Sequence, residues 1–287
     1  MGRVRLRLGL LLENVKFEHT IFALPFAYLG MVLAAHGLPT LYQFIWITIA
    51  MASARTLAMS LNRVVDREID ARNPRTAGRP IPSGRLSTRL VIGVAVASAV
   101  VLAVAAWALG PLPLKLLPIA LIFLVGYHHV KRFSSLCHLV LGITDGGAPI
   151  GGWVAVAGTV EPVALCMGGA VALWVGGFDL IYACQDVDFD RANGLHSVPA
   201  DFGIPAAIWL ARSWHVGTML LLAAVGILAS LGWLYWLGWT LAALLLLFEH
   251  RLVSPSDLSR VGLAFFNVNG YLAVGVFVFT LAAVLVR

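Results

Sequence analysis

The sequence predicts an all-α, multi-pass membrane protein with about nine transmembrane helices and cytoplasmic cap loops. Of its 287 residues, 60% are hydrophobic and only 12% are charged, and the mean hydropathy is +0.89. A soluble domain carries roughly 25% charged residues, so lipid must surround most of this chain. Apolar runs of membrane-spanning length recur from end to end, which predicts a single membrane-embedded domain over residues 1–287.

Each apolar run is close to the length needed to cross a bilayer, about 17–25 residues. In order, the predicted spans are residues 20–36, 42–66, 88–109, 113–128, 137–157, 162–185, 203–229, 231–248 and 262–286. Turn-forming pairs such as Gly110-Pro111 and Ser254-Pro255 separate most of them. The boundary near Ser230 has the weakest turn signal.

The basic residues predict the orientation of the chain. If the N-terminus is cytoplasmic, most of the 20 lysines and arginines fall on the cytoplasmic side. They lie in the basic N-terminal segment and in the loops around residues 67–87, 131–132 and 186–202. This is the positive-inside pattern, so we expect a cell-membrane protein whose functional loops are cytoplasmic. Membrane topology accounts for the net charge of +6, and nucleic acid is not an expected partner.

The first polar constellation lies at the cytoplasmic end of the second span. Asn62, Asp66 and Asp70 are spaced i, i+4, i+8, so a continuous helix would place them on one face. Oxygen-bearing side chains in one stripe suit Mg²⁺, which usually retains several water ligands and is also coordinated by substrate phosphates. The alternative is an ordinary charged helix end with capping acids.

The second constellation follows the sixth span. Asp179, Tyr182, Asp186 and Asp190 are spaced i, i+3, i+7, i+11, again one face of a continuous helix. Asp188 falls off this stripe and is expected to face solvent. Helix capping alone is a poor explanation for two acidic motifs on the same side of the membrane. Ionisable groups near membrane spans are costly, so their presence indicates a function.

Basic residues on the same side predict a phosphate ligand. Arg79 lies in the first long loop, and Lys131 and Arg132 follow Tyr127 by about one turn in the loop after the fourth span. Such cations pair well with phosphate oxygens. The alternative for Lys131 and Arg132 is simple anchoring at the membrane surface.

Arg55 has two interpretations. It lies seven residues before Asn62, so on the same helix face and about 10 Å deeper in the membrane. It either binds the carboxylate of an aromatic substrate or forms a buried ion pair with Asp179, which lies at the matching depth. Asp145, inside the fifth span, either lines a cavity or pairs with a nearby cation.

These motifs resemble those of the UbiA superfamily of intramembrane prenyltransferases, and the flanking sequence is similar to its 4-hydroxybenzoate polyprenyltransferase branch. The family pattern N-D-x-x-D-x-x-x-D matches from Asn62 to Asp70, with Arg63 in place of one aspartate. The pattern D-x-x-Y-A-x-x-D-x-x-x-D matches from Asp179 to Asp190.

Two cytoplasmic loops extend the resemblance. The family's Y-x-x-x-K-R sequence matches from Tyr127 to Arg132, and R-P-x-P-S-G matches from Arg79 to Gly84. A lysine that is common late in the second loop is His196 here, which removes one expected diphosphate contact.

The resemblance implies helices around a central cavity. It also implies transfer of a polyprenyl group from its diphosphate to an aromatic acid in quinone biosynthesis, with 4-hydroxybenzoate as the main expectation for the acceptor. It implies Mg²⁺ ligands at Asn62, Asp66, Asp70, Asp186 and Asp190, with the four aspartates and Lys131 as catalytic residues. It implies substrate contacts from Arg55, Arg79, Tyr127, Lys131, Arg132, Asp179 and Tyr182. The alternatives are another acceptor, such as dihydroxynaphthoate, or a cation-coupled membrane transporter.

Overall fold

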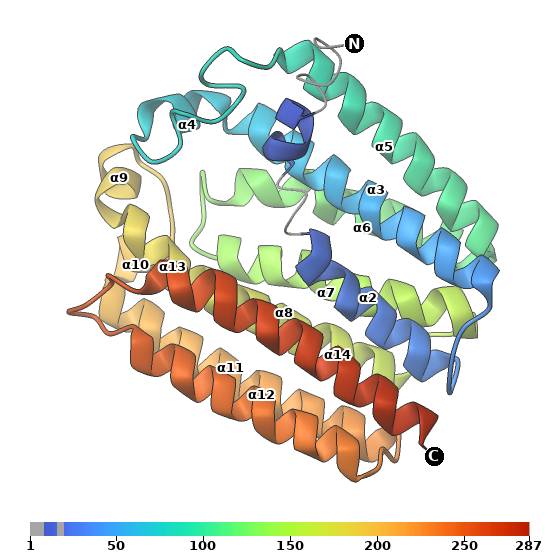
Figure 1. Cartoon of the computed structure of the whole chain (residues 1–287). Coiled ribbons are helices and arrows are strands. Elements are labelled where there is room, and N and C mark those ends of the chain that lie inside the picture. Colours follow the sequence, from blue (N-terminus) through green and yellow to red (C-terminus); the bar gives the residue numbers. More distant parts are fainter. Residues whose placement is uncertain (1–8, 16–19, 287) are drawn as a thin grey trace.

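A computed structural model describes residues 9–15 and 20–286 of the chain. Its long helices form one bundle (Figure 1). They are α2 (Thr20–Ala34), α3 (Leu41–Val65), α5 (Thr88–Leu109), α6 (Pro111–Val130), α7 (Cys137–Ala157), α8 (Pro162–Ala183), α11 (Ile204–Leu228), α12 (Trp233–Leu252) and α14 (Asn269–Leu285). The short elements are α4 (Arg67–Arg72), the 3₁₀ turn η2 (Cys184–Asp186), α9 (Val187–Ala192), α10 (Val198–Phe202), α13 (Val261–Leu263) and the π-helical turn η3 (Ala264–Val268).

The first eight long helices coincide with the predicted spans to within about four residues, whereas the last predicted span, 262–286, is divided into α13, η3 and α14. Six helices in the described part of the chain are long and apolar enough to cross a membrane, and α14 and most of α2 form shorter apolar helices. Large apolar side chains point outward, among them Ile122, Leu220 and Trp233, which are 66–70% exposed. Exposed apolar surface of this extent is the mark of a protein surrounded by lipid, so the all-α membrane fold is confirmed.

Local chemistry sets the helix boundaries. Thr40 begins α3 with a capping box, in which its hydroxyl accepts from the Gln43 N–H and the Gln43 side chain accepts from the Thr40 N–H. Pro111 begins α6, at a position where a missing N–H is harmless. Gly158 ends α7 with φ 67°. The weakly signalled boundary is a real turn, where Ser230 has φ 47°.

Helix α7 packs closely against α2 on one side and α8 on the other. Gly152 lies against the Ala27 carbonyl of α2, and Gly142 lies against the Ala172 carbonyl of α8. A Cβ atom at either glycine would overlap that oxygen. Small residues permit this backbone approach in membrane helix pairs, and α7 therefore joins two parts of the bundle.

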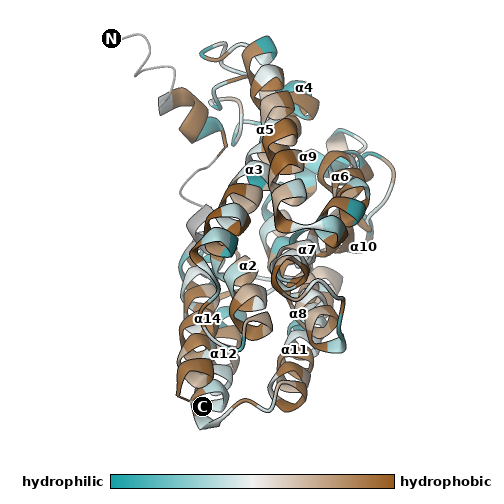
Figure 2. Ribbon diagram, turned by 90° about the vertical axis from the view of Figure 1, so that its right-hand side faces the viewer, coloured by the Kyte–Doolittle hydropathy of each residue, from teal (hydrophilic) through white to brown (hydrophobic). Residues whose placement is uncertain are grey.

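Polar residues gather at one end of the bundle. Helices α4, α9 and α10 lie together at that end (Figure 1). Hydrophobic residues cover much of the long helices, and hydrophilic residues colour the loops beside α4 and α9 (Figure 2). The basic N-terminal segment, predicted to lie on the cytoplasmic side, falls mostly outside the described residues.

Candidate active site

Each aspartate motif straddles a junction between two helices. Asp66 lies between α3 and α4 with φ −92° and ψ 7°, and Asp186 is the last residue of η2, directly before α9, with φ −106° and ψ 8°. Both residues occupy the bridge region of backbone space, where active-site residues are often found. The predicted continuous helical face was therefore wrong at these two points. Aspartate disfavours helix interiors because its side chain competes for local backbone hydrogen bonds.

Every aspartate of the two predicted metal motifs lies beside a basic side chain. The pairs are Asp66 with Arg132 (3.2 Å), Asp70 with Arg79 (2.7 Å), Asp186 with Arg75 (2.5 Å) and Asp190 with Lys131 (3.7 Å). Arg75 approaches Asp186 with two nitrogens, each donating to a different carboxylate oxygen. Charge-assisted bidentate pairs of this kind are strong and directional.

These pairs surround a polar cleft of about 240 Å³ at the α4–α9 end of the bundle. Tyr127, Lys131 and Tyr182, all predicted substrate contacts, also line the cleft. Asn62 completes the first motif by donating from Nδ2 to Asp66 Oδ2 at 3.1 Å. Residues that are far apart in sequence thus form a single charged site, as the two motifs together predicted.

Burial affects the charges in this cleft. Asp66 is 8% exposed, and this burial raises the pKa of its carboxyl group above the usual range, against the opposing effect of Lys131 and Arg132. Burial lowers the pKa of Arg75, but its hydrogen bonds and attraction to Asp186 outweigh that effect, so the pKa lies above its ordinary value. Burial thus makes the Asp66 carboxyl harder to ionise, whereas Asp186 stabilises the charged form of Arg75.

The donor set of the cleft fits Mg²⁺. Asn62, Asp66, Asp70, Asp186 and Asp190 offer the oxygen ligands that this ion prefers. Within residues 9–15 and 20–286, no group of three or more His, Cys, Asp or Glu side chains is placed to hold a metal ion alone. Mg²⁺ commonly takes one or two carboxylates and completes its shell with waters and substrate phosphates. Asp190 Oδ1 is buried and has no hydrogen-bond partner in the described residues.

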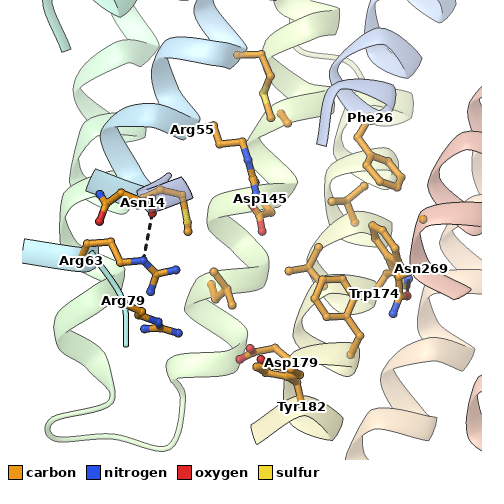
Figure 3. A pocket seen from close by; sticks show the side chains of 18 of the residues that line it. Asn14, Phe26, Arg55, Arg63, Arg79, Asp145, Trp174, Asp179, Tyr182 and Asn269 are labelled. Atoms are coloured by element: carbon orange, nitrogen blue, oxygen red, sulfur yellow. Dashed lines mark hydrogen bonds between the residues drawn. The ribbon is translucent and has the colours of Figure 1, made fainter. Parts of the chain in front are cut away.

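A deeper cavity of about 490 Å³, whose lining Figure 3 shows, adjoins the polar cleft. Arg63, Arg79, Asp179 and Tyr182 line both spaces. The far part of the cavity is apolar and aromatic. A charged mouth therefore leads to an interior that is apolar and aromatic in part but also contains Arg55 and Asp145.

A third, more apolar chamber of about 440 Å³ lies among α3, α5, α6 and α7. It shares Arg55, Asp145, Met51 and Met59 with the deeper cavity, and it reaches Tyr127 near the polar cleft. The interior thus has two branches that meet at Arg55 and Asp145.

The structure separates Arg55 from Asp179. Figure 3 shows the Arg55 guanidinium directed toward Asp145, whereas Asp179 lies beside Tyr182 near the cavity mouth. Asp179 Oδ2 is instead 2.7 Å from His138 Nδ1, so of the two interpretations of Arg55, the ion pair with Asp179 was wrong. Arg55 Nε is buried and has no hydrogen-bond partner in the described part of the chain.

Sequence reasoning missed three residues of the site. Arg75 and Asn73 both bind Asp186 from the first long loop, across 111 and 113 positions of sequence. His138, at the start of α7, holds Asp179. The basic residues of the loop were a signal for a site there. Because the loop backbone is irregular, no regular spacing distinguishes Arg75 from the neighbouring arginines.

Two other predictions concern the second loop. Asp188 is exposed, as expected for a residue off the aspartate stripe. His196, which replaces the family's usual lysine, lines the polar cleft, and its Nδ1 lies 3.1 Å from Asp201 Oδ2. Its side chain is therefore engaged within its own loop.

A helical membrane bundle with paired aspartate junctions at the mouth of an internal cavity fits an intramembrane transferase. The model of the UbiA prenyltransferase family matches residues 23–284, and the chain belongs to this family. The 4-hydroxybenzoate solanesyltransferase of Synechocystis sp. is 33% identical over 215 residues, or 74% of this chain and 73% of that protein. The 4-hydroxybenzoate octaprenyltransferase of Aeromonas salmonicida is 32% identical over 252 residues, or 86% and 84%. The chain is accordingly a prenyltransferase.

Solved structures agree with this fold. A UbiA homolog from Aeropyrum pernix K1 superimposes with a TM-score of 0.84 and 34% identity, covering 92% of this chain and 98% of that one. A UbiA homolog from Archaeoglobus fulgidus, solved with DMAPP and Mg²⁺, has a TM-score of 0.65 and 17% identity, over 93% and 98% of the two chains.

Proposed function

We propose that the protein transfers a polyprenyl group from its diphosphate to an aromatic acid, with 4-hydroxybenzoate as the acceptor, in a Mg²⁺-dependent step of quinone biosynthesis. The observation that carries this proposal is the pairing of four aspartates with four basic side chains at the mouth of an apolar cavity. The names of the two enzyme relatives support the choice of acceptor. Family membership favours an enzyme over the transporter alternative.

The polar cleft is the diphosphate site in this proposal. Mg²⁺ held by the two aspartate motifs and Asn62 would stabilise negative charge on the leaving diphosphate. Arg75, Arg79, Lys131 and Arg132 turn from the carboxylates to the phosphate oxygens. Arginine and lysine bind phosphate well in such settings, arginine with paired hydrogen bonds and lysine as a point charge.

The apolar interior protects the reaction. The allylic C–O bond breaks with its electron pair on the diphosphate oxygen, a ring carbon of the acceptor then donates an electron pair, and that carbon loses its proton to water at the cleft. Water would capture the allylic cation, so the walls must exclude it. The chamber among α3, α5, α6 and α7 offers an apolar space for the prenyl chain.

Arg55 is the acceptor's carboxylate contact in this proposal. Its Nε is buried and unpaired in the described residues, and a buried unpaired donor on a charged group is costly. An acceptor carboxylate at the meeting point of the two branches would satisfy it. Asp145 beside Arg55 keeps the guanidinium oriented until the acceptor arrives.

We also propose that the polar cleft faces the cytoplasm of a cell-membrane protein. The loops that form it carry Arg75, Arg79, Lys131 and Arg132, so the positive-inside rule places them on the cytoplasmic side. The prenyl diphosphate would enter with its head group at that surface and its chain in the bilayer.

Product formation tests the proposal. Detergent-solubilised protein is incubated with Mg²⁺, geranyl diphosphate and 4-hydroxybenzoate, and products are identified by mass spectrometry, with dihydroxynaphthoate in parallel. We expect prenylated 4-hydroxybenzoate, its loss with EDTA, and its loss in Asp186→Asn. Asp188→Asn, a neighbouring exposed aspartate, is the matched control and retains activity. Absence of product with every aromatic acid, together with cation flux in liposomes, would overturn the enzyme proposal.

A further inference from the structure

Three arginines line both the polar cleft and the deeper cavity, and one of them lacks a carboxylate of its own. They are Arg63, Arg75 and Arg79. Arg75 donates to both oxygens of Asp186, and Arg79 donates to both oxygens of Asp70. The ion pair of Arg63 is with Asp70 at 3.9 Å, a carboxylate that Arg79 already holds. Arg63 is therefore a surplus positive charge at the boundary between the two spaces.

Neutral oxygens hold the Arg63 side chain. Its Nε donates to the Asn14 carbonyl at 3.3 Å, and its Nη1 donates to Asn62 Oδ1 at 3.3 Å. The residue is 7% exposed, and its Nη2 has no hydrogen-bond partner among the described residues. Figure 3 shows the guanidinium group directed into the cavity. Because a buried charged donor without a partner is costly, an anion that reaches Nη2 would be bound favourably.

The N-terminal helical turn fixes the position of this guanidinium group. Leu10 packs against the buried cluster that contains Ile81, and Glu13 forms an ion pair with Arg85 at 3.0 Å. The next residue, Asn14, supplies the carbonyl that accepts from Nε. The donor that faces the cavity is therefore pre-positioned by contacts outside the cleft.

This charge is a departure from the family pattern. Arg63 lies where the first motif of the family has an aspartate, between Asn62 and Asp66, which the chain retains. The exchange of an aspartate for an arginine changes the local charge by two units. A fixed cation thus replaces an acidic group beside the proposed diphosphate site.

The position of Arg63 selects one part of the substrate. In the proposed function the diphosphate lies in the polar cleft, and the prenyl chain leaves the cleft for the apolar interior. The phosphate attached to the chain must then lie at the boundary that Arg63 lines. Arginine suits an anionic phosphate oxygen because its donors form a planar fork.

We infer that Arg63 binds the phosphate that carries the prenyl chain, and that this contact forms before any metal is bound. The inference rests on the proposed function. Arg75 and Arg79 must leave their aspartates before they can bind phosphate, whereas Nη2 of Arg63 requires no such exchange. When the allylic C–O bond breaks, its electron pair passes to an oxygen of this phosphate, and the same guanidinium group stabilises the developing charge. Arg63 is thus a catalytic residue as well as a binding residue.

Binding in EDTA tests the metal-independent contact. Geranyl thiolodiphosphate, in which sulfur replaces the oxygen of the scissile bond, is titrated into detergent-solubilised protein by calorimetry. We expect wild type to bind this analogue and Arg63→Gln to bind it roughly 10- to 100-fold more weakly, because a hydrogen bond between charged groups is lost. Arg63→Lys keeps the charge but not the fork of donors, and its affinity should be intermediate.

Arg67→Gln is the matched control. Arg67 lies one helical turn after Arg63, but it donates to the Val64 carbonyl and forms an exposed ion pair with Glu68 at 2.8 Å. We expect this variant to bind the analogue like wild type. Melting temperatures in detergent check that each variant folds. If Arg63→Gln does not fold, Arg63→Lys makes the same test, and an affinity equal to that of wild type would contradict the contact.

Steady-state kinetics at saturating Mg²⁺ test the catalytic part. We expect Arg63→Gln to lower kcat roughly 10- to 100-fold, with a smaller change in the KM for geranyl diphosphate, since Mg²⁺ and the other cations still bind the ground state. Arg63→Asp restores the usual residue of the family. It should lose both the analogue binding in EDTA and most of the turnover, and wild-type values for this variant would contradict the inference.

The outcomes separate this inference from the proposed function. Wild type that binds no analogue in EDTA at millimolar concentration overturns the metal-independent contact. If Arg63→Gln changes only the KM for the aromatic acid, Arg63 contacts the acceptor and the inference is wrong. Wild type that binds the analogue through Arg63 but prenylates no aromatic acid overturns the proposed acceptor and supports the phosphate contact.

Discussion

In the proposed site Arg75 would compete with Mg²⁺ for Asp186, and its removal should therefore change two affinities in opposite directions. In Arg75→Gln the carboxylate loses a bidentate charged partner. Hydrogen bonds to charged groups contribute about 1.5–3 kcal/mol net, and we reduce this to about 1–2 kcal/mol because the Arg75 side chain is 35% exposed. Mg²⁺ no longer has to displace that partner, so its affinity without substrate should rise roughly 5- to 30-fold.

The same change should weaken binding of the diphosphate. The lost guanidinium is one of the basic groups that the proposal assigns to phosphate oxygens, so we expect the KM for geranyl diphosphate to rise roughly tenfold. Isothermal titration with Mg²⁺ alone gives the first affinity, and steady-state kinetics at saturating Mg²⁺ give the second.

Arg72→Gln is the matched control for this prediction. Arg72 lies three positions before Arg75 but donates to the Glu68 carbonyl and, at 3.5 Å, to Asn193. We expect both affinities to stay near wild type in this variant. If Arg75→Gln weakened Mg²⁺ binding in the absence of substrate, the idea of competition for Asp186 would be refuted.

Three further changes test other parts of the molecule. Asp190→Asn should lower kcat at least about a hundredfold and raise the Mg²⁺ requirement, because it removes a charged ligand; near-normal turnover at low Mg²⁺ would contradict this assignment. Arg55→Lys should raise the KM for 4-hydroxybenzoate about tenfold at saturating prenyl diphosphate, and an unchanged KM would exclude the carboxylate contact. Gly142→Ala should destabilise the protein by about 1–3 kcal/mol, seen as a lower melting temperature in detergent, because its Cβ would overlap the Ala172 carbonyl. Gly93→Ala, where a Cβ meets nothing within 4 Å, should melt like wild type.

The fold was predictable because its determinants are local. Apolar length specifies each span, and turn residues such as Gly110 and Pro111 mark most boundaries. The turn at Ser230 was also predicted from span length, although no glycine at this position indicates a left-handed backbone. Helix periodicity then placed the aspartates near one another without any knowledge of long-range contacts.

The remaining features of the site depend on geometry that periodicity does not encode. The backbone turns at Asp66 and Asp186 interrupt helices that the spacing predicted as continuous. Arg75 reaches Asp186 from an irregular loop, so neither register nor spacing identifies it. Depth along a helix suggested that Arg55 and Asp179 would pair, but depth does not determine the direction of a side chain around the helix axis.

The four ion pairs of the polar cleft have a thermodynamic consequence for the order in which ligands bind. In the proposed site, Mg²⁺ would have to take its carboxylates from Arg75 and Arg79. The diphosphate would have to take its cations from Asp186 and Asp70. Each ligand therefore frees the groups that the other requires. The two should bind with positive heterotropic cooperativity, and reciprocity requires the diphosphate to increase Mg²⁺ affinity by the same factor as Mg²⁺ increases that of the diphosphate.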